Sequence, residues 1–110
     1  MALTKDFRET VQARVRKDEK FRRGLLRDAV EAFLADEGEL GREILRDFIN
    51  ATVGFPELAR KTGIHVKTLH QMFGPNGNPT AQNLFNIIAC LQEHEGVRLR
   101  VVARQAVLFL

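Results

Sequence analysis

The sequence predicts an all-α domain of five or six helices followed by a short β-strand, and three observations favour this fold. The chain has 110 residues, of which 45% are hydrophobic and 28% are charged, a balance that supports one hydrophobic core. Apolar residues recur three and four positions apart along most of the chain, which is the spacing of one helix face. Near the end, Val97, Leu99 and Val101 instead alternate with arginines, which is the period of a half-buried strand.

Two helices are expected in residues 1–38, as an extension that packs on the rest of the domain. Thr4 is a candidate cap for a helix over residues 5–16. Asp18 is a candidate cap for a second helix, and Gly38 is expected to end it, because glycine is a common C-terminal stop. The apolar positions of the first helix are Phe7, Val11 and Val15, and those of the second are Phe21, Leu25, Leu26, Ala29, Val30, Phe33 and Leu34.

Residues 39–96 are predicted to form the central helical unit, and its first helix covers residues 40–53. A short helix follows with Pro56 in its first turn, where the missing N–H of proline costs no hydrogen bond. Gly63 ends this helix. Because glycine enters the left-handed region without steric cost, we expect a tight corner between two helices at this residue.

The corner leads into a helix over residues 65–73, which keeps Leu69 and Met72 for the core. Residues 74–79 are rich in glycine, proline and asparagine and predict a compact loop. Thr80 is a candidate cap for the last helix, over residues 81–92. The core positions of that helix are Leu84, Ile87, Ile88 and Leu91.

Residues 97–110 are predicted to contain the strand and to contact another chain. A single strand leaves its backbone groups unpaired, so the same strand of a second copy, antiparallel about a twofold axis, is its simplest partner. We therefore expect a homodimer, with Val97, Leu99 and Val101 as candidate contacts. The apolar residues 107–110 form another candidate contact surface.

Several classes of protein are excluded by composition or spacing. The chain has no serine, no tyrosine and one cysteine, which excludes serine hydrolases, tyrosine nucleophiles and disulfide frameworks. His65 and His70 lie about 140° apart around a helix and cannot share a metal ion. Cys90 falls beside core positions and is interpreted as a buried structural thiol. We expect no enzyme activity, no cofactor and no bound metal.

No apolar run reaches the ~18 residues that span a bilayer, so we expect a cytoplasmic protein without a membrane partner. The formal net charge is +3, which is compatible with a polyanionic partner.

A helix, a glycine corner and a second helix remain as the constellation that can carry a function. Two helices that meet steeply need small and apolar residues to pin them to a third helix. Ala59, Gly63, Ile64, Leu69 and Met72 occupy those positions. Residues 55–74 resemble the helix-turn-helix of the Cro and phage-repressor (Xre) family, and residues 78–91 are similar to the next helix of that family.

A closer resemblance spans most of the chain. Residues 45–52, 55–59 and 74–80 look like the small bacterial regulators known as HigA-type addiction-module antidotes, or antitoxins. The resemblance implies sequence-specific binding to double-stranded operator DNA, repression of the protein's own operon and neutralisation of a toxin encoded beside it. A cognate toxin would then dock on the N-terminal helices or on residues 97–110.

The resemblance also places the exposed face of the second motif helix in the major groove. The candidates for contact with base edges are His65, Val66, Lys67, Thr68, His70 and Gln71. The candidates for contact with phosphates are Arg60, Lys61, Asn78, Thr80 and Asn83. A dimer would present two such helices to half-sites about 34 Å apart.

Two other interpretations of the same helices stay open. The chain can be a helical adaptor that binds only protein, in which case the polar face of residues 65–71 is merely solvated. It can also be a basic RNA-binding module. A basic cluster in the N-terminal part is either a solvated helix surface or a second contact with nucleic acid; it contains Arg14, Arg16, Lys17, Lys20, Arg22 and Arg23.

Overall fold

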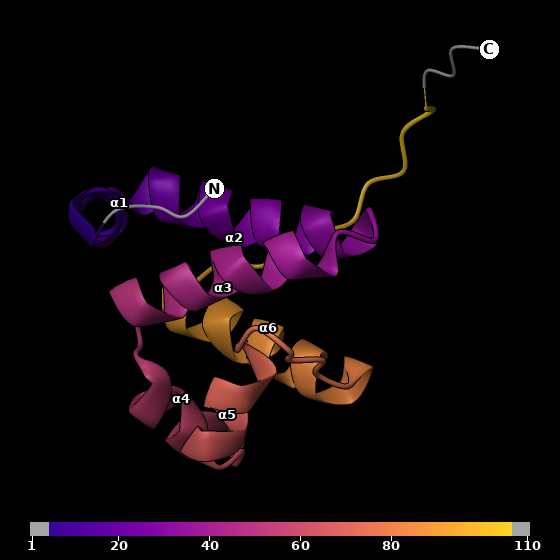
Figure 1. Cartoon of the computed structure of the whole chain (residues 1–110). Coiled ribbons are helices and arrows are strands. Elements are labelled where there is room, and N and C mark those ends of the chain that lie inside the picture. The colour runs from indigo at the N-terminus through magenta and orange to yellow at the C-terminus, as the bar shows by residue number, and fades with distance from the viewer. Residues whose placement is uncertain (1–4, 107–110) are drawn as a thin grey trace.

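The computed structural model of the chain describes residues 5–106, except for the side chains of residues 5–8 and 11. Six helices follow one another in this part (Figure 1). They are α1 (Lys5–Lys17), α2 (Glu19–Leu34), α3 (Gly38–Ala51), α4 (Phe55–Thr62), α5 (Val66–Met72) and α6 (Ala81–Glu95). The predicted all-α class and the number of helices are confirmed. The predicted cap Thr4, the side chains of Phe7 and Val11, and the apolar residues 107–110 lie outside the described part of the chain.

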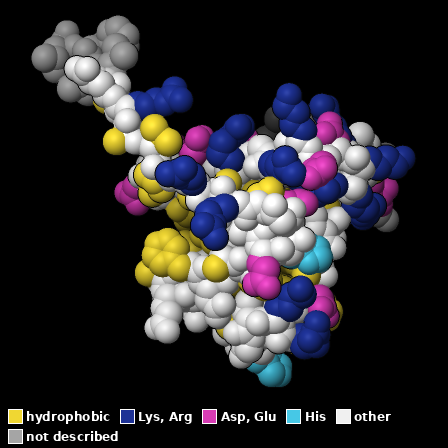
Figure 2. Space-filling model, turned by 180° about the vertical axis from the view of Figure 1, so that it is seen from behind, with side chains coloured by type: hydrophobic (Ala, Val, Ile, Leu, Met, Phe, Trp, Pro, Cys, Tyr) yellow, Lys and Arg dark blue, Asp and Glu magenta, His cyan; other side chains and the backbone are white. Residues whose placement is uncertain are grey.

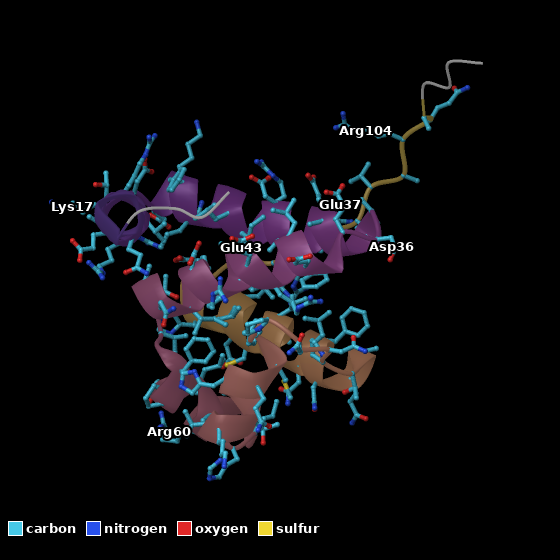
Figure 3. All side chains as sticks on the ribbon, viewed as in Figure 1. Lys17, Asp36, Glu37, Glu43, Arg60 and Arg104 are labelled. Carbon is cyan, nitrogen blue, oxygen red and sulfur yellow. The ribbon has the colours of Figure 1, made fainter. Side chains whose placement is uncertain are left out.

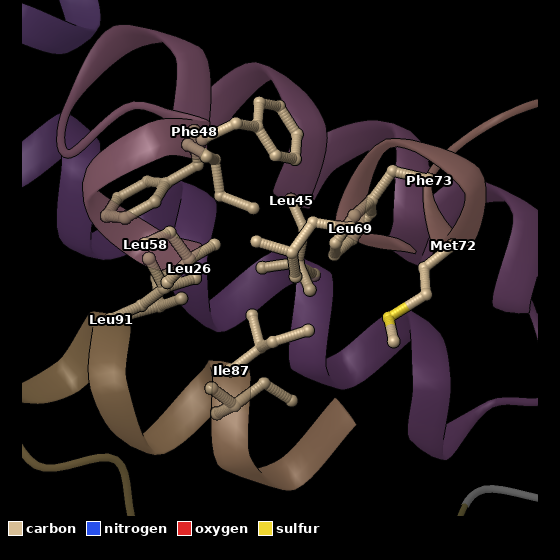
Figure 4. Close-up of a cluster of buried hydrophobic side chains, with 13 residues drawn as sticks. Leu26, Leu45, Phe48, Leu58, Leu69, Met72, Phe73, Ile87 and Leu91 are labelled. Atoms are coloured by element: carbon tan, nitrogen blue, oxygen red, sulfur yellow. The ribbon is translucent and has the colours of Figure 1, made fainter. Parts of the chain in front are cut away.

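The helices form two groups that share one core. α2 and α3 lie side by side with α1 across one end, and α4 and α5 form the opposite side of the molecule, with α6 between the groups (Figure 1). Leu26 of α2, Leu45 of α3 and Leu58 of α4 are fully buried in the same cluster, together with Leu69 of α5 and Ile87 of α6 (Figure 4). The N-terminal helix α2 is therefore an integral wall of the core that supports α4 and α5.

Two of the predicted helix caps are present in the structure. The Asp18 carboxylate accepts a hydrogen bond from the backbone N–H of Phe21 at 3.0 Å. The Thr80 hydroxyl accepts one from the N–H of Asn83 at 3.2 Å. Each cap satisfies one of the N–H groups that the first turn of a helix leaves without a partner.

The predicted end of the second helix at Gly38 is wrong. α2 ends at Leu34, and Gly38 is instead the first residue of α3. The chain reverses within three residues, because Asp36 adopts a left-handed conformation with φ of 61° and the Glu37 N–H bonds back to the Ala32 carbonyl at 2.8 Å. Aspartate tolerates this conformation better than most residues, so the turn needs no glycine.

The predicted C-terminal strand is not present in residues 5–106, which contain helices and no strand. The Leu99 N–H donates to the side-chain Oε1 of Gln92 at 2.8 Å, so it is used within the chain. Val97 and Leu99 pack on the core, whereas Val101 is 81% exposed. After that point the chain runs away from the helices (Figure 1). We call residues 97–106 the tail.

Candidate nucleic-acid interface

The corner between α4 and α5 is built around Gly63. This residue has φ of 77° and ψ of 9°, the left-handed conformation predicted for it, and its N–H bonds to the Ala59 carbonyl at 2.9 Å. A Cβ at this position would meet no atom within 4 Å, so the backbone conformation rather than crowding accounts for the glycine.

Thr62 braces the corner on both sides. Its hydroxyl donates to the Leu58 carbonyl at 2.8 Å and accepts from the Ile64 N–H at 3.2 Å. The side-chain amide of Asn86 on α6 donates to the Thr62 carbonyl at 3.2 Å. α6 therefore holds the corner at the last residue of α4. Sequence reasoning missed Asn86, since its contact with Thr62 joins positions 24 apart and leaves no local pattern.

α5 starts at a cap that the sequence did not reveal. His65 precedes the helix, and its Nδ1 accepts a hydrogen bond from the Lys67 N–H at 3.1 Å. Nδ1 must therefore carry a lone pair, so in the neutral ring the proton sits on Nε2. This nitrogen is left as a donor at the exposed start of the helix.

One face of α5 is buried and the other is open. Leu69 is fully buried and Met72 is 7% exposed, and both belong to the core. Five of the six candidates for base contact are exposed; they are His65, Lys67, Thr68, His70 and Gln71. The structure thus gathers on one short helix polar side chains that can donate and accept hydrogen bonds.

Val66 and His70 differ from the other members of this set. Val66 is half-buried and packs against the core, so only part of its side chain is open to a thymine methyl group. The His70 ring lies over the Phe55 ring at the start of α4, with 4.6 Å between ring centroids. This contact limits the orientations that the otherwise exposed imidazole can take.

Among the candidates for phosphate contact, Arg60 is paired with a carboxylate. It donates from Nε to Glu57 at 3.0 Å and from Nη2 to the other carboxylate oxygen. The hydrogen bond from Arg60 lowers the pKa of Glu57, and the same bond raises the pKa of Arg60. Arg60 lies at the outer edge of the α4 and α5 side (Figure 3), where it is exposed and can exchange this partner for a phosphate.

Lys61 is exposed beside Arg60, and the remaining phosphate candidates lie in and after the loop over residues 74–79. The loop packs tightly on the end of α5, because a Cβ on Gly77 would come within 2.0 Å of the Met72 carbonyl oxygen. Asn78 and Thr80 are exposed and Asn83 is half-buried. The Thr80 hydroxyl and the Asn83 N–H are already joined in the cap of α6.

Three further findings in the described part of the chain concern metal binding, the Cys90 thiol and membrane-spanning helices. No group of three or more His, Cys, Asp and Glu side chains is placed to hold a metal ion there. Cys90 is half-buried rather than fully buried, and desolvation raises the pKa of its thiol. Within residues 5–106, no helix combines the length and apolar character that crossing a bilayer requires.

The comparisons with known proteins give no relative. No protein-family model, no curated protein and no solved structure matches the chain.

Proposed function

We propose that this chain is a sequence-specific DNA-binding regulator that reads double-stranded DNA through α5. The observation that carries the proposal is the division of α5 into a buried face, with Leu69 and Met72, and an exposed polar face beyond the Gly63 corner. An α-helix with its side chains is about 10–12 Å in diameter, and the major groove is about 12 Å wide. The exposed face therefore fits the groove without rearrangement of the core.

Each part of that face has a suitable chemistry for the groove. Gln71 offers an amide that can pair bidentately with adenine, and Lys67 offers an ammonium group for guanine acceptors or a phosphate. The Nε2–H of His65 is a further donor, held in place because Nδ1 is committed to the helix cap. Arg60 and Lys61, on the helix before the corner, supply positive charge for the phosphate backbone.

The more specific part of the proposal is an antitoxin that represses its own operon, and it rests on the resemblance of residues 45–52, 55–59 and 74–80 to HigA-type antidotes. Its partners are then an operator, a second copy of the chain and a toxin. The gene next to that of this chain distinguishes the possibilities, since a small basic ribonuclease-like neighbour supports an antitoxin and any other neighbour supports an ordinary repressor.

The test is a binding experiment on duplexes selected from genomic fragments. The double variant Lys67→Ala with Gln71→Ala should bind the selected duplex at least about tenfold more weakly, because each good side-chain pair with a base contributes about 1–3 kcal/mol. The control is Asn50→Ala with Glu93→Ala, which removes two exposed polar side chains to which no contact is assigned, one from α3 and one from α6. The control should bind as the unchanged chain does.

Three outcomes contradict the proposal. If no duplex is preferred over any other, the chain does not read sequence, and a protein-binding adaptor is favoured. If single-stranded RNA competes better than duplex DNA, the chain is an RNA-binding module. If both double variants lose affinity equally, the contact is not centred on α5. Circular dichroism of each variant shows that the helices are retained.

A further inference from the structure

The tail and the adjacent helices enclose an apolar groove on the side of the molecule away from α5. The groove measures about 320 Å³. Its apolar lining comes from α2, α6 and the tail, and consists of Val30, Leu34, Ile88, Leu99, Val101 and Val102. In the space-filling view, hydrophobic side chains gather where the tail leaves the body and continue down the neighbouring surface (Figure 2).

Three of these side chains are left mostly in contact with solvent. Leu34 is 68% exposed, Val101 is 81% exposed and Val102 is 71% exposed. Scattered apolar residues are common on protein surfaces, but a contiguous patch beside a groove marks an interaction site. The tail makes the patch more accessible, because residues 100–106 are exposed along an extended stretch of chain.

Charges of both signs line the groove, with Arg27 and Glu31 on α2 and Arg100 on the tail, and further acidic residues lie next to it in the turn after α2. The tail has three arginines, Arg98, Arg100 and Arg104, and no acidic residue. The stretch over residues 28–43, which ends α2 and begins α3, has six acidic residues and one basic residue. Glu31 and Arg100 both line the groove. Figure 3 labels Asp36 and Glu37 in the turn after α2 and Arg104 on the tail.

We propose that this groove is the contact between two copies of the chain, in which the tail of each copy lies against the α2 edge of the other. A twofold interface requires one surface that complements itself. The groove meets this requirement, because the same patch holds an apolar floor, an acidic edge and a basic segment. Each tail then covers Leu34 of the other copy with Val101 and Val102 and brings its arginines to the acidic residues of α2.

This contact differs from the one that the alternating pattern of residues 97–101 predicts. Val97 and Leu99 pack on the core of their own chain, and only Leu99 also lines the groove. The proposed contact between copies is therefore made by the exposed side chains of Val101, Val102 and Leu34. It does not depend on DNA binding, so its test uses protein alone and can fail or succeed whatever the function of α5.

The first test is sedimentation velocity of the full chain at micromolar concentration. We expect a dimer, and the double variant Val101→Ser with Val102→Ser should dissociate at least about tenfold more readily. Phe85→Ser is the matched control, because Phe85 is 66% exposed on α6 and does not line the groove. It should dimerise as the unchanged chain does. A monomeric full chain, or a dimer that the tail variant leaves intact, overturns the proposal.

The second test asks whether the tail crosses between copies. Glu31→Arg alone and Arg100→Glu alone should each weaken the dimer by about tenfold, since each places like charges opposite one another. In a mixture of the two variants, a heterodimer restores opposite charges at both copies of the contact and should regain the original stability. If the mixture dimerises no more strongly than each variant alone, Glu31 and Arg100 do not meet across the interface. The proposed contact of each tail with α2 of the other copy is then wrong.

Discussion

Arg22, at the start of α2, donates a hydrogen bond from Nε to the Glu95 carboxylate in the last turn of α6. The two side chains are 19% and 8% exposed. Arg22 also donates from Nη1 to the carbonyls of Val15 and Arg16 at 3.1 Å and 2.8 Å, which are acceptors at the end of α1. One guanidinium thus joins the ends of α1 and α6 to the beginning of α2, and the hydrogen bond with Glu95 raises its pKa.

Removing either member of this pair should destabilise the fold. Arg22→Met leaves a shielded carboxylate and two helix carbonyls without a donor, and we expect a loss of about 2–3 kcal/mol in the free energy of unfolding. Urea unfolding followed by circular dichroism measures it. In a double-mutant cycle with Glu95→Gln, the two losses should not add, because both remove the same contact. Fully additive losses would show that the residues do not interact in solution.

The exposed pair of Glu57 and Arg60 should show its effect in a titration rather than in overall stability. The hydrogen bond from Arg60 lowers the pKa of Glu57 in the folded state. The contribution of the pair is therefore present above the unfolded-state pKa of Glu57 and is lost as the pH falls through the lowered folded value. An NMR titration should place the Glu57 midpoint below that of an ordinary glutamate, and Arg60→Gln should bring it back. An unchanged midpoint in the variant would contradict the pairing.

Gly77 and Gly63 should respond differently to alanine, because they are required for different reasons. At Gly63 the Cβ of an alanine would meet no atom within 4 Å, so only the left-handed backbone disfavours it. We expect the free energy of unfolding to fall by about 1 kcal/mol. At Gly77 the new Cβ would lie 2.0 Å from the Met72 carbonyl oxygen, so the loop must move. Unfolding in guanidinium chloride should show a larger loss for Gly77→Ala than for Gly63→Ala. The reverse order would mean that the loop packs differently on α5.

Cys90 should react slowly with thiol reagents. Desolvation raises the pKa of its thiol, and the thiolate is the form that reacts. At pH 8 we expect alkylation by iodoacetamide to be several-fold slower in the folded chain than in the chain unfolded by urea, as followed by mass spectrometry. Equal rates in the two states would show that neither burial nor the raised pKa protects the sulfur.

Local signals in the sequence predicted much of the fold and little of its tertiary detail. The caps at Asp18 and Thr80 and the corner at Gly63 depend on a few adjacent residues, and all three are present. The end of α2 was mispredicted because Asp36 takes a conformation that glycine usually supplies. The alternation after Val97 is typical of a strand, but in this chain it reflects an extended segment that packs one side, with Val97 and Leu99, on the helices.

The candidate interface was predictable in the same way. The exposed residues of α5 follow from helix periodicity and from the apolar positions that fix which face is buried. The bond from Asn86 was not predictable, because it depends on which helix lies next to the turn. The cap by His65 and the brace by Thr62 depend on the side-chain orientations at the corner, which the residue pattern does not determine.

The burial of Leu26 and Ala29 beside residues of α4, α5 and α6 has a consequence for how the protein can be shortened. A fragment that begins at Gly38 would keep the whole helical pair around Gly63 and yet lose one wall of the cluster that positions it. Such a fragment should collapse into a loosely ordered state instead of retaining a smaller working module. The helix α2 is thus required to hold the corner between α4 and α5 in its place.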